Sequence, residues 1–408
     1  MSSALDNIKV LDLSRVPTGS YCTMIMGDLG AEVLKVETPL SAGERQAGQG
    51  IPLKGTGTKR EIAFNALDRN KKSIALNLKT DEGKKVIFQL VKQFDVFLEC
   101  FRPGVAGRLG IDYNSLSKLN PKLVYCSLTG WGQDGPRRNF PGHDLNFIAA
   151  SGALNLIGEK GRKPVIPLNL VADYAGGSLL CVIGILAALW AREKTGRGQY
   201  VDIAMADGAL SLLSASPVAA DFLLNAQEPK RGETIMSGGY PFYNTYLAGD
   251  GKYVALGCAE PWFWENFCRA IGKEDLIPFH LLYQKPLTGK VAVKLRKVTK
   301  ELEKTFLART SAQWVEFLGD KDIPISPVNS LKDVFNDPQV IQRKMLIELK
   351  TEGLGTVRQT GIPVKMSDTP GAVRRLAPAL GENTDEILAG LGYSNKEIEE
   401  LRKKGAAQ

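Results

Sequence analysis

Three stretches of the chain place an ionisable side chain beside glycine or proline. They are residues 141–146 (PGHDLN), 168–177 (LNLVADYAGG) and 256–264 (LGCAEPWFW), and their ionisable groups are His143, Asp173 and Glu260. Imidazole and carboxyl groups act in proteins as general acids, general bases and nucleophiles. These three residues are therefore the candidates for chemistry.

Asp173 comes immediately before a long apolar stretch, so the sequence predicts that it is the N-cap of a helix. Backbone N–H groups at a helix N-terminus stabilise negative charge, including an oxyanion that develops during a reaction. Gly176 and Gly177 would let a ligand approach the backbone closely. The plainer interpretation is that Asp173 only caps its helix, that His143 is a loop histidine, and that Glu260 is a turn acid.

The elements that must position these residues begin with a strand, a helix and a second strand. Hydrophobic runs and helical periodicity then continue to alternate along the first half of the chain. Strands are expected at 8–13, 31–36, 73–78, 96–99, 123–128 and 200–203, and helices at 18–29, 81–93 and from about 173 to 193. This alternation predicts a parallel α/β sheet with a Rossmann-like core.

The second half of the chain has a different sequence pattern, with short strand-like runs and aromatic-rich helical stretches. We expect a large domain from residues 1–205 and 335–408, a linker over 206–240, and a small α+β domain with its return linker over 241–334. The charged C-terminal segment is expected to pack back on the large domain.

Several cofactor classes lack their sequence signatures. No GxGxxG follows the first strand, and neither a P-loop nor an HExxH motif occurs, which argues against nicotinamide, flavin and nucleotide-hydrolysis chemistry. With two histidines and no Cys/His cluster, a metal site is not expected. The chemistry should come from side chains alone.

The net charge of +8 favours a polyanionic small molecule as ligand. The basic residues are spread along the chain without a basic helix, so no nucleic-acid partner is expected. Six cysteines without a CxxC pair indicate reduced thiols. The N-terminus lacks a signal-peptide core and the longest apolar run, 178–191, is too short for a membrane span, so we expect a cytoplasmic protein without a membrane partner.

Seven further stretches resemble the class III coenzyme A (CoA) transferase superfamily, also called the CaiB/BaiF family, in the same order along nearly the whole chain. They are residues 10–15 (VLDLSR), 28–37 (DLGAEVLKVE), 69–74 (RNKKSI), 101–105 (FRPGV), 130–136 (GWGQDGP), 184–189 (GILAAL) and 195–202 (TGRGQYVD). Within that family, the sequences around His143, Asp173 and Glu260 are most similar to the α-methylacyl-CoA racemase branch.

This resemblance implies a site and a fold. The racemase branch has its catalytic histidine, aspartate and glutamate at the positions of His143, Asp173 and Glu260. The CoA phosphates would be contacted by basic residues of two motifs, namely Arg69, Lys71, Lys72 and Arg102. The resemblance further implies an interlocked homodimer, an acyl-CoA substrate of lipid metabolism, and no cofactor beyond the CoA that the substrate carries.

Two other functions remain open on the sequence. In the transferase branch the aspartate attacks the thioester, and CoA passes between carboxylic acids through an aspartyl-CoA thioester. A CoA-binding subunit without activity is the third hypothesis. This chain also departs from the common family pattern at Ser20, Thr38 and Cys100, three positions expected near the CoA.

Overall fold

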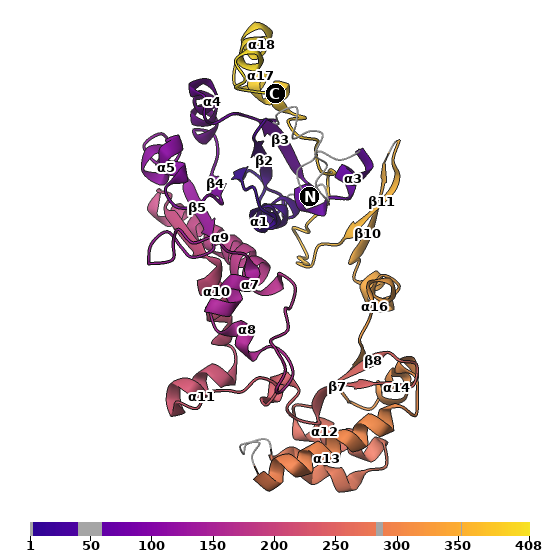
Figure 1. Cartoon of the computed structure of the whole chain (residues 1–408). Helices are drawn as coiled ribbons and strands as arrows, with labels where there is room; N and C mark the ends of the chain where they lie inside the picture. The colour runs from indigo at the N-terminus through magenta and orange to yellow at the C-terminus, as the bar shows by residue number, and fades with distance from the viewer. Residues whose placement is uncertain (1–2, 40–58, 283–288, 352) are drawn as a thin grey trace. The chain divides into compact units, whose positions relative to one another are not determined.

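The computed structural model describes residues 3–39, 59–282, 289–351 and 353–408. The chain divides into two compact units (Figure 1). The first consists of Met1–Ser151, Leu168–Leu212 and Pro338–Gln408, and the second of Gly152–Pro167 and Leu213–Asp337. Each unit has a sheet and a hydrophobic core of its own.

The first unit is built on a parallel sheet whose strands are ordered β3-β2-β1-β4-β5-β6. The strands are β1 (Lys9–Leu13), β2 (Glu32–Glu37), β3 (Lys71–Ala75), β4 (Val96–Glu99), β5 (Val124–Thr129) and β6 (Tyr200–Ala204). This order is that of the doubly wound dinucleotide-binding fold, in which ligands bind outside the carboxyl ends of the strands. The predicted parallel α/β sheet is confirmed.

Burial explains why the strands read as continuous apolar runs. Every residue of β4 and β5 is buried, because helices cover both faces of a parallel sheet. Leu11 of β1 lies opposite Leu34 of β2 and Phe97 of β4, and all three side chains belong to one core cluster. The edge strand β6 is more exposed.

Both ends of the chain contribute to this unit. Helices α17 and α18 pack with α4 on the core of the sheet, and the last residues run beside β3, where Leu76 pairs with Ala407 (Figure 1). The C-terminal segment therefore does pack on the N-terminal half. The helices of the unit are α1 (Pro17–Asp28), α3 (Lys59–Phe64), α4 (Asp81–Val91), α5 (Val105–Leu109), α6 (Tyr113–Leu116), α7 (Asp144–Ala150), α10 (Met205–Leu213), α16 (Pro338–Gln342), α17 (Thr384–Gly390) and α18 (Asn395–Lys403), and η1 (Ala66–Asp68) is a 3-10 turn. The unit also contains an antiparallel hairpin formed by β10 (Leu346–Thr351) and β11 (Gly355–Thr360).

The long apolar helix begins with a π-helix, η2 (Leu170–Leu179), and continues as α9 (Leu180–Thr195). It packs on β5 and β6, where Cys181, Ile185 and Leu189 are buried. At 26 residues this helix is longer than the apolar run suggested, and by length and composition alone it could cross a membrane. The expectation that its length excludes a membrane span was therefore wrong, although its packing on the sheet is that of a core helix.

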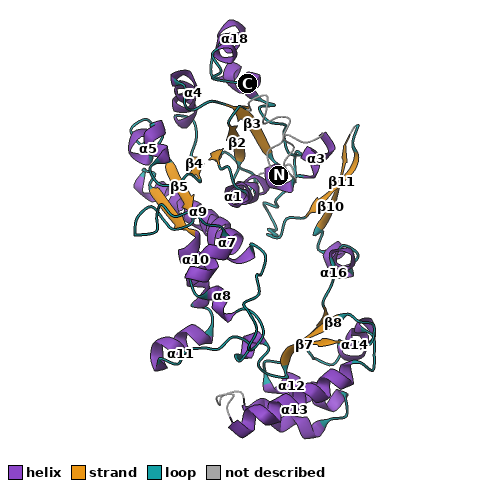
Figure 2. Cartoon of the chain, viewed as in Figure 1, coloured by secondary structure: helices purple, strands orange, loops and turns teal. Residues whose placement is uncertain are grey.

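The second unit combines a three-stranded antiparallel sheet with helices (Figure 2). Its strands are β7 (Tyr243–Leu247), β8 (Tyr253–Gly257) and β9 (Ile325–Pro327), and its helices α8 (Ala153–Leu156), α11 (Pro217–Asn225), η3 (Ile235–Ser237), α12 (Pro261–Ala270), η4 (Glu274–Leu282), α13 (Gly289–Phe306), α14 (Ser311–Leu318) and α15 (Leu331–Val334). The stretch 206–240, expected as a linker, carries the greater part of α10 and all of α11. Residues 152–167, expected in the large domain, cluster with this unit.

Candidate active site

His143 is the N-cap residue of α7 and its side chain is exposed. Its backbone N–H donates to the Oδ1 atom of Asn146 at 3.1 Å, which closes the first turn of the helix. Beneath the turn, the ring of Phe147 is buried and leaves no room for a side chain at Gly142, where a Cβ atom would lie 2.6 Å from the ring. The backbone of His143 is thus held by packing, while its imidazole is exposed to solvent.

Asp173 lies in the first turn of η2, one turn further into the helix than expected. The N-cap is Asn169, so the prediction that Asp173 is the N-cap was wrong. The helix begins at Leu170, so residues 170–172 form its first turn ahead of Asp173. The Nδ2 atom of Asn169 donates to the Oδ2 atom of Asp173 at 3.1 Å, and the carboxyl group is half-buried.

The surroundings of Asp173 favour its protonated form. Burial raises the pKa of the Asp173 carboxyl group; the hydrogen bond from Asn169 opposes this, the charge of Asp144 adds to it, and the charge of His143 opposes it. The structure therefore brings His143 within electrostatic reach of Asp173. Each of these two titratable groups therefore feels the charge of the other.

A second acid, Asp144, follows His143 and contacts the backbone at Asp173. Its Oδ2 atom accepts the backbone N–H of Ala172 at 2.7 Å and that of Asp173 at 2.9 Å. These two amides are therefore not available to a developing oxyanion, contrary to the expectation for the start of the Asp173 helix. The buried carboxylate of Asp144 accepts hydrogen bonds from both amides and so occupies them.

The two glycines after Asp173 contact protein rather than an open surface. A Cβ atom at Gly176 would lie 2.7 Å from the backbone nitrogen of Ala209 in α10, and one at Gly177 would lie 2.9 Å from the side chain of Met205. The expectation that these glycines admit a ligand was wrong. They let η2 and α10 cross at short range.

Glu260 belongs to the second unit, where it is the N-cap residue of α12. Its neighbour there is the other histidine, His280, whose ring nitrogen Nε2 lies 3.1 Å from the carbonyl oxygen of Cys258 and 3.0 Å from that of Ala259. Burial lowers the pKa of His280, and the charge of Glu260 acts in the opposite direction. An interaction of Glu260 with His143 stays a prediction.

Two of the four basic residues expected at the CoA phosphates are buried ion-pair partners. Arg69 is fully buried, and its Nε and Nη2 atoms lie 2.9 and 2.6 Å from the two carboxylate oxygens of Asp28. The Nζ atom of Lys71, also fully buried, lies 3.0 Å from Asp12 and 3.1 Å from Asp68. Because carboxylates already neutralise these charges inside the protein, the structure argues against direct phosphate contact by Arg69 and Lys71.

The other two residues, Lys72 and Arg102, reach the protein surface. The Nζ atom of Lys72 lies 2.6 Å from Glu386, in a pair that remains partly open to water. Arg102 is exposed in the loop after β4. Phosphate contact by Lys72 and Arg102 stays a prediction, since surface pairs of this kind exchange partners at little cost.

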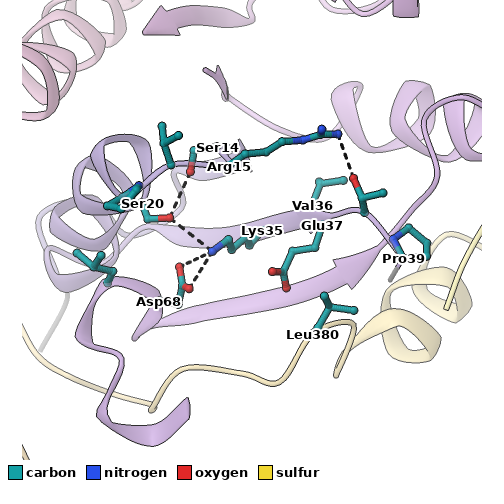
Figure 3. Close-up of a pocket in the computed structure, with 13 residues that line it drawn as sticks. Ser14, Arg15, Ser20, Lys35, Val36, Glu37, Pro39, Asp68 and Leu380 are labelled. Atoms are coloured by element: carbon teal, nitrogen blue, oxygen red, sulfur yellow. Dashed lines mark hydrogen bonds and ion pairs between the residues drawn. The ribbon is translucent and has the colours of Figure 1, made fainter. Parts of the chain in front are cut away.

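A pocket of about 270 Å³ opens at the carboxyl ends of β1 and β2 (Figure 3). It lies entirely in the first unit and combines apolar, basic and acidic side chains. Its lining residues are Ser14, Arg15, Val16, Pro17, Ser20, Lys35, Val36, Glu37, Thr38, Pro39, Leu67, Asp68 and Leu380. In a sheet of this strand order, this edge is where ligands bind.

Arg15 is the exposed cation of this pocket. Its guanidinium group lies 5.2 Å from the centroid of the Phe101 ring and donates to the hydroxyl of Thr38 at 3.0 Å. No role for Arg15 was predicted from the sequence. Its position two residues beyond the first parallel strand was the available signal, since residues there face the ligand edge of the sheet.

The pocket floor holds charges that are already paired. The Nζ atom of Lys35 lies 2.8 Å from both carboxylate oxygens of Asp68, as Figure 3 shows. Glu37, the last residue of β2, accepts a hydrogen bond from the hydroxyl of Ser73, and burial raises the pKa of its carboxyl group. An acid at this position binds a ribose hydroxyl in doubly wound folds.

The chain matches the CoA-transferase family III over residues 5–384. It belongs to this family. The pocket at the ligand edge of the sheet and the His143–Asp173 pair thus lie in a chain whose family acts on CoA thioesters.

Two relatives illustrate the range of the family. The chain is 33% identical over 404 residues to the α-methylacyl-CoA racemase of Homo sapiens, covering 98% of this chain and 96% of the racemase. It is also 33% identical over 403 residues to the human succinyl-CoA:glutarate CoA-transferase, covering 98% and 89%. Racemase and transferase are thus equally similar to this family III member.

The fold agrees with that of a solved relative. A CaiB/BaiF family protein from Brucella suis superposes with a TM-score of 0.79 at 30% sequence identity, covering 96% of this chain and all of the other. The family III chain is therefore an α/β protein of the CaiB/BaiF type.

Proposed function

We propose that the protein epimerises 2-methylacyl-CoA thioesters by removing the α-proton and returning a proton to the opposite face. The observation that supports this proposal is that Asp144, the residue after His143, accepts the backbone N–H of Asp173, which brings His143 within electrostatic reach of the Asp173 carboxyl group. Epimerisation requires an acid/base group on each side of one carbon. Transfer of CoA through an aspartyl thioester requires only the aspartate.

In the proposed mechanism, one of the two groups takes the proton from the α carbon of one epimer, and an enolate forms. The other group then protonates the opposite face, and the roles reverse for the other epimer. The raised pKa of Asp173 suits this double task, because general acid–base catalysis is most effective when the pKa lies towards the working pH.

Two further roles complete the proposal. The amides of Ala172, Asp173 and His143 are occupied, so stabilisation of the enolate oxygen is assigned to the backbone N–H groups of Asp144 and Leu145 at the start of α7. Glu260 would orient the His143 imidazole or tune its proton affinity. No cofactor other than the CoA of the substrate is required.

The CoA nucleotide is assigned to the pocket at the ends of β1 and β2. Arg15 would contact its phosphates, and Glu37 would accept a hydrogen bond from its ribose. Lys72 and Arg102 remain candidates for further phosphate contacts. The net charge of +8 favours such a polyanionic ligand.

We further propose a homodimer located in the cytoplasm. An apolar stripe that runs from the last residue of η2 along α9 is exposed in this chain and is formed by Leu179, Ile183, Ala187 and Trp190. Stripes of this kind mark interaction surfaces, and a second copy of the chain would cover it. The six free thiols are compatible with a reducing compartment.

Deuterium uptake tests the proposed reaction. A single epimer of a 2-methylacyl-CoA ester is incubated with the enzyme in heavy water without any acceptor acid. We expect deuterium at the α carbon and formation of the other epimer. A panel of branched acyl chains would then identify the preferred acyl group.

The rival functions give different results in the same assay. If no deuterium enters, but CoA moves to an added carboxylic acid and Asp173 carries a hydroxylamine-sensitive adduct, the protein is a transferase. If neither reaction occurs and CoA still binds, the protein is a CoA-binding subunit. Either result overturns epimerisation.

A further inference from the structure

Asp144 has an unusual set of partners for a residue in the first turn of a helix. It follows His143 directly and is the first residue of α7, yet its side chain is 3% exposed. Its Oδ2 atom accepts hydrogen bonds from the backbone N–H groups of Ala172 and Asp173. These residues belong to another helix and lie 28 and 29 residues further along the chain. Its Oδ1 atom has no hydrogen-bond partner among the described residues.

Capping of its own helix does not explain this arrangement. A capping acid accepts N–H groups from the turn in which it lies. In α7 the side chain of Asn146 closes that turn by accepting the N–H of His143. The Asp144 carboxylate instead joins two helices: Asp144 follows His143 in α7, and its side chain accepts the N–H of Asp173 in η2.

The same carboxylate acts on the charge of Asp173. The negative charge of Asp144 raises the pKa of the Asp173 carboxyl group, whereas Asn169 and His143 act in the opposite direction. The other packed elements bring Tyr21 of α1, which contacts Tyr174, Asp202 of β6 and Asp207 of α10. The first turn of α9 carries no acid, and β5 carries no charged residue.

We propose that Asp144 is a positioning residue that ties the backbone at Asp173 to the first turn of α7 and so sets where the Asp173 carboxyl group stands relative to His143. This inference rests on the proposed function, because it matters only where both groups act on one carbon. A displacement of about 1 Å in such a pair lowers the rate about a hundredfold.

Two substitutions separate geometry from charge. Asp144→Asn keeps an oxygen that can accept both amides and removes the negative charge. We expect a folded enzyme whose pH–rate limb assigned to Asp173 moves to lower pH, because the charge that raises the pKa of Asp173 is gone. Asp144→Ala removes both hydrogen bonds, and we expect kcat for α-proton exchange to fall about a hundredfold with KM changed by less than about threefold.

Asp112→Ala provides the matched control. Asp112 also accepts two hydrogen bonds through its side chain, from the N–H and the hydroxyl of Ser115, at the start of α6. Its loss should leave kcat and the pH profile unchanged. A general loss of helix stability would affect both variants alike.

Amide hydrogen exchange provides a measurement that does not depend on activity. In D144A, the amides of Ala172 and Asp173 should exchange at least about tenfold faster than in the wild type, and in D144N they should stay protected. If the wild type takes up no deuterium from heavy water into the substrate, the proposed function fails. If the wild type does so and D144A retains full kcat, or if amides 172 and 173 keep their protection in D144A, the positioning role is overturned while epimerisation stands.

Discussion

At the scale of single residues, the Asp173 carboxyl group is held where its charged form is disfavoured. It is half-buried, one nearby acid raises its pKa further, and a single side-chain amide donates to it. Such a group destabilises the folded protein once it ionises, because the unfolded chain gives up the proton more easily. Retention of an acid at this costly position is consistent with a catalytic role.

Replacement of Asp173 by asparagine should remove activity and leave the fold intact. We expect α-proton exchange to fall by about a thousandfold, the usual contribution of a general acid or base. Since the folded pKa is raised, the wild type loses stability as the pH rises from the unfolded pKa of about 4 through the folded value, and the variant does not.

Thermal unfolding of both proteins between pH 3 and pH 8 measures this difference. The advantage of D173N should be absent at the acidic end and reach its full size above the folded pKa. Equal α-proton exchange by the variant would remove Asp173 from the mechanism.

At the scale of elements, the π-helix η2 is positioned by its crossing with α10. A Cβ atom at Gly208 of α10 would lie 2.0 Å from the carbonyl oxygen of Gly176, so the two backbones are almost in contact. Gly176 lies three residues after Asp173, within the same π-helix. The crossing of η2 and α10 therefore determines how deeply the Asp173 carboxyl group is buried.

Gly176→Ala should displace η2 away from α10. The new methyl group would meet backbone atoms at 2.7 and 2.9 Å, which cannot be relieved by a rotamer change. We expect a loss of about 1–3 kcal/mol in unfolding free energy and reduced α-proton exchange. Denaturant unfolding and the deuterium assay measure the two effects.

Gly107→Ala is the control for this substitution. Gly107 lies in α5, and a Cβ atom there would meet nothing within 4 Å. Alanine should be neutral or stabilise that helix by up to about 1 kcal/mol. The prediction fails if both variants behave alike.

At the scale of the whole molecule, buried ion pairs tie distant segments of the first unit together. The Arg69 guanidinium group joins Asp28 at the end of α1 to the carbonyl oxygen of Thr360 in β11, at 2.6 Å. Lys71 in turn lies between Asp12 of β1 and Asp68. The N-terminal strands and the C-terminal hairpin therefore depend on one another.

Arg69→Met should destabilise the protein strongly. The molecules that remain folded should bind CoA with unchanged affinity. The substitution leaves Asp28 as a buried carboxylate without its cation, which costs about 3–5 kcal/mol. Calorimetry measures the stability, and equilibrium binding of CoA at low temperature measures the affinity. A large loss of affinity with unchanged stability would instead support phosphate contact by Arg69.

The pair of Arg358 with Glu348 offers a matched comparison. It lies at 2.7 Å on the hairpin of β10 and β11, but both side chains are more than half exposed to water. Arg358→Met should therefore cost less than about 1 kcal/mol.

The sequence predicted the strands of the parallel sheet and its longer helices well because their signals are local, whereas short elements such as α5 and the hairpin of β10 and β11 were not predicted. Strands and helices were expected within two residues of most observed ends, as at β4 and α4. The helix that contains Asp173 begins earlier than predicted. Its first turn is held by Asp144 of another helix, which accepts the N–H of Ala172, and the local sequence does not reveal this contact. The roles of Gly176 and Gly177 were also wrong, because α10 meets them through space rather than along the chain.

By itself, the sequence determined the parallel α/β sheet and the family, since these depend on periodicity and on the types of neighbouring residues; its acid/base residues stay a prediction. Only the tertiary structure decided which charges are solvated and which are paired. The motif 69–74 reads as a basic patch, but Arg69 and Lys71 are neutralised by Asp28 and Asp12 from earlier segments. The free energy of a charge depends on the groups that surround it in space, and those groups are distant in the sequence.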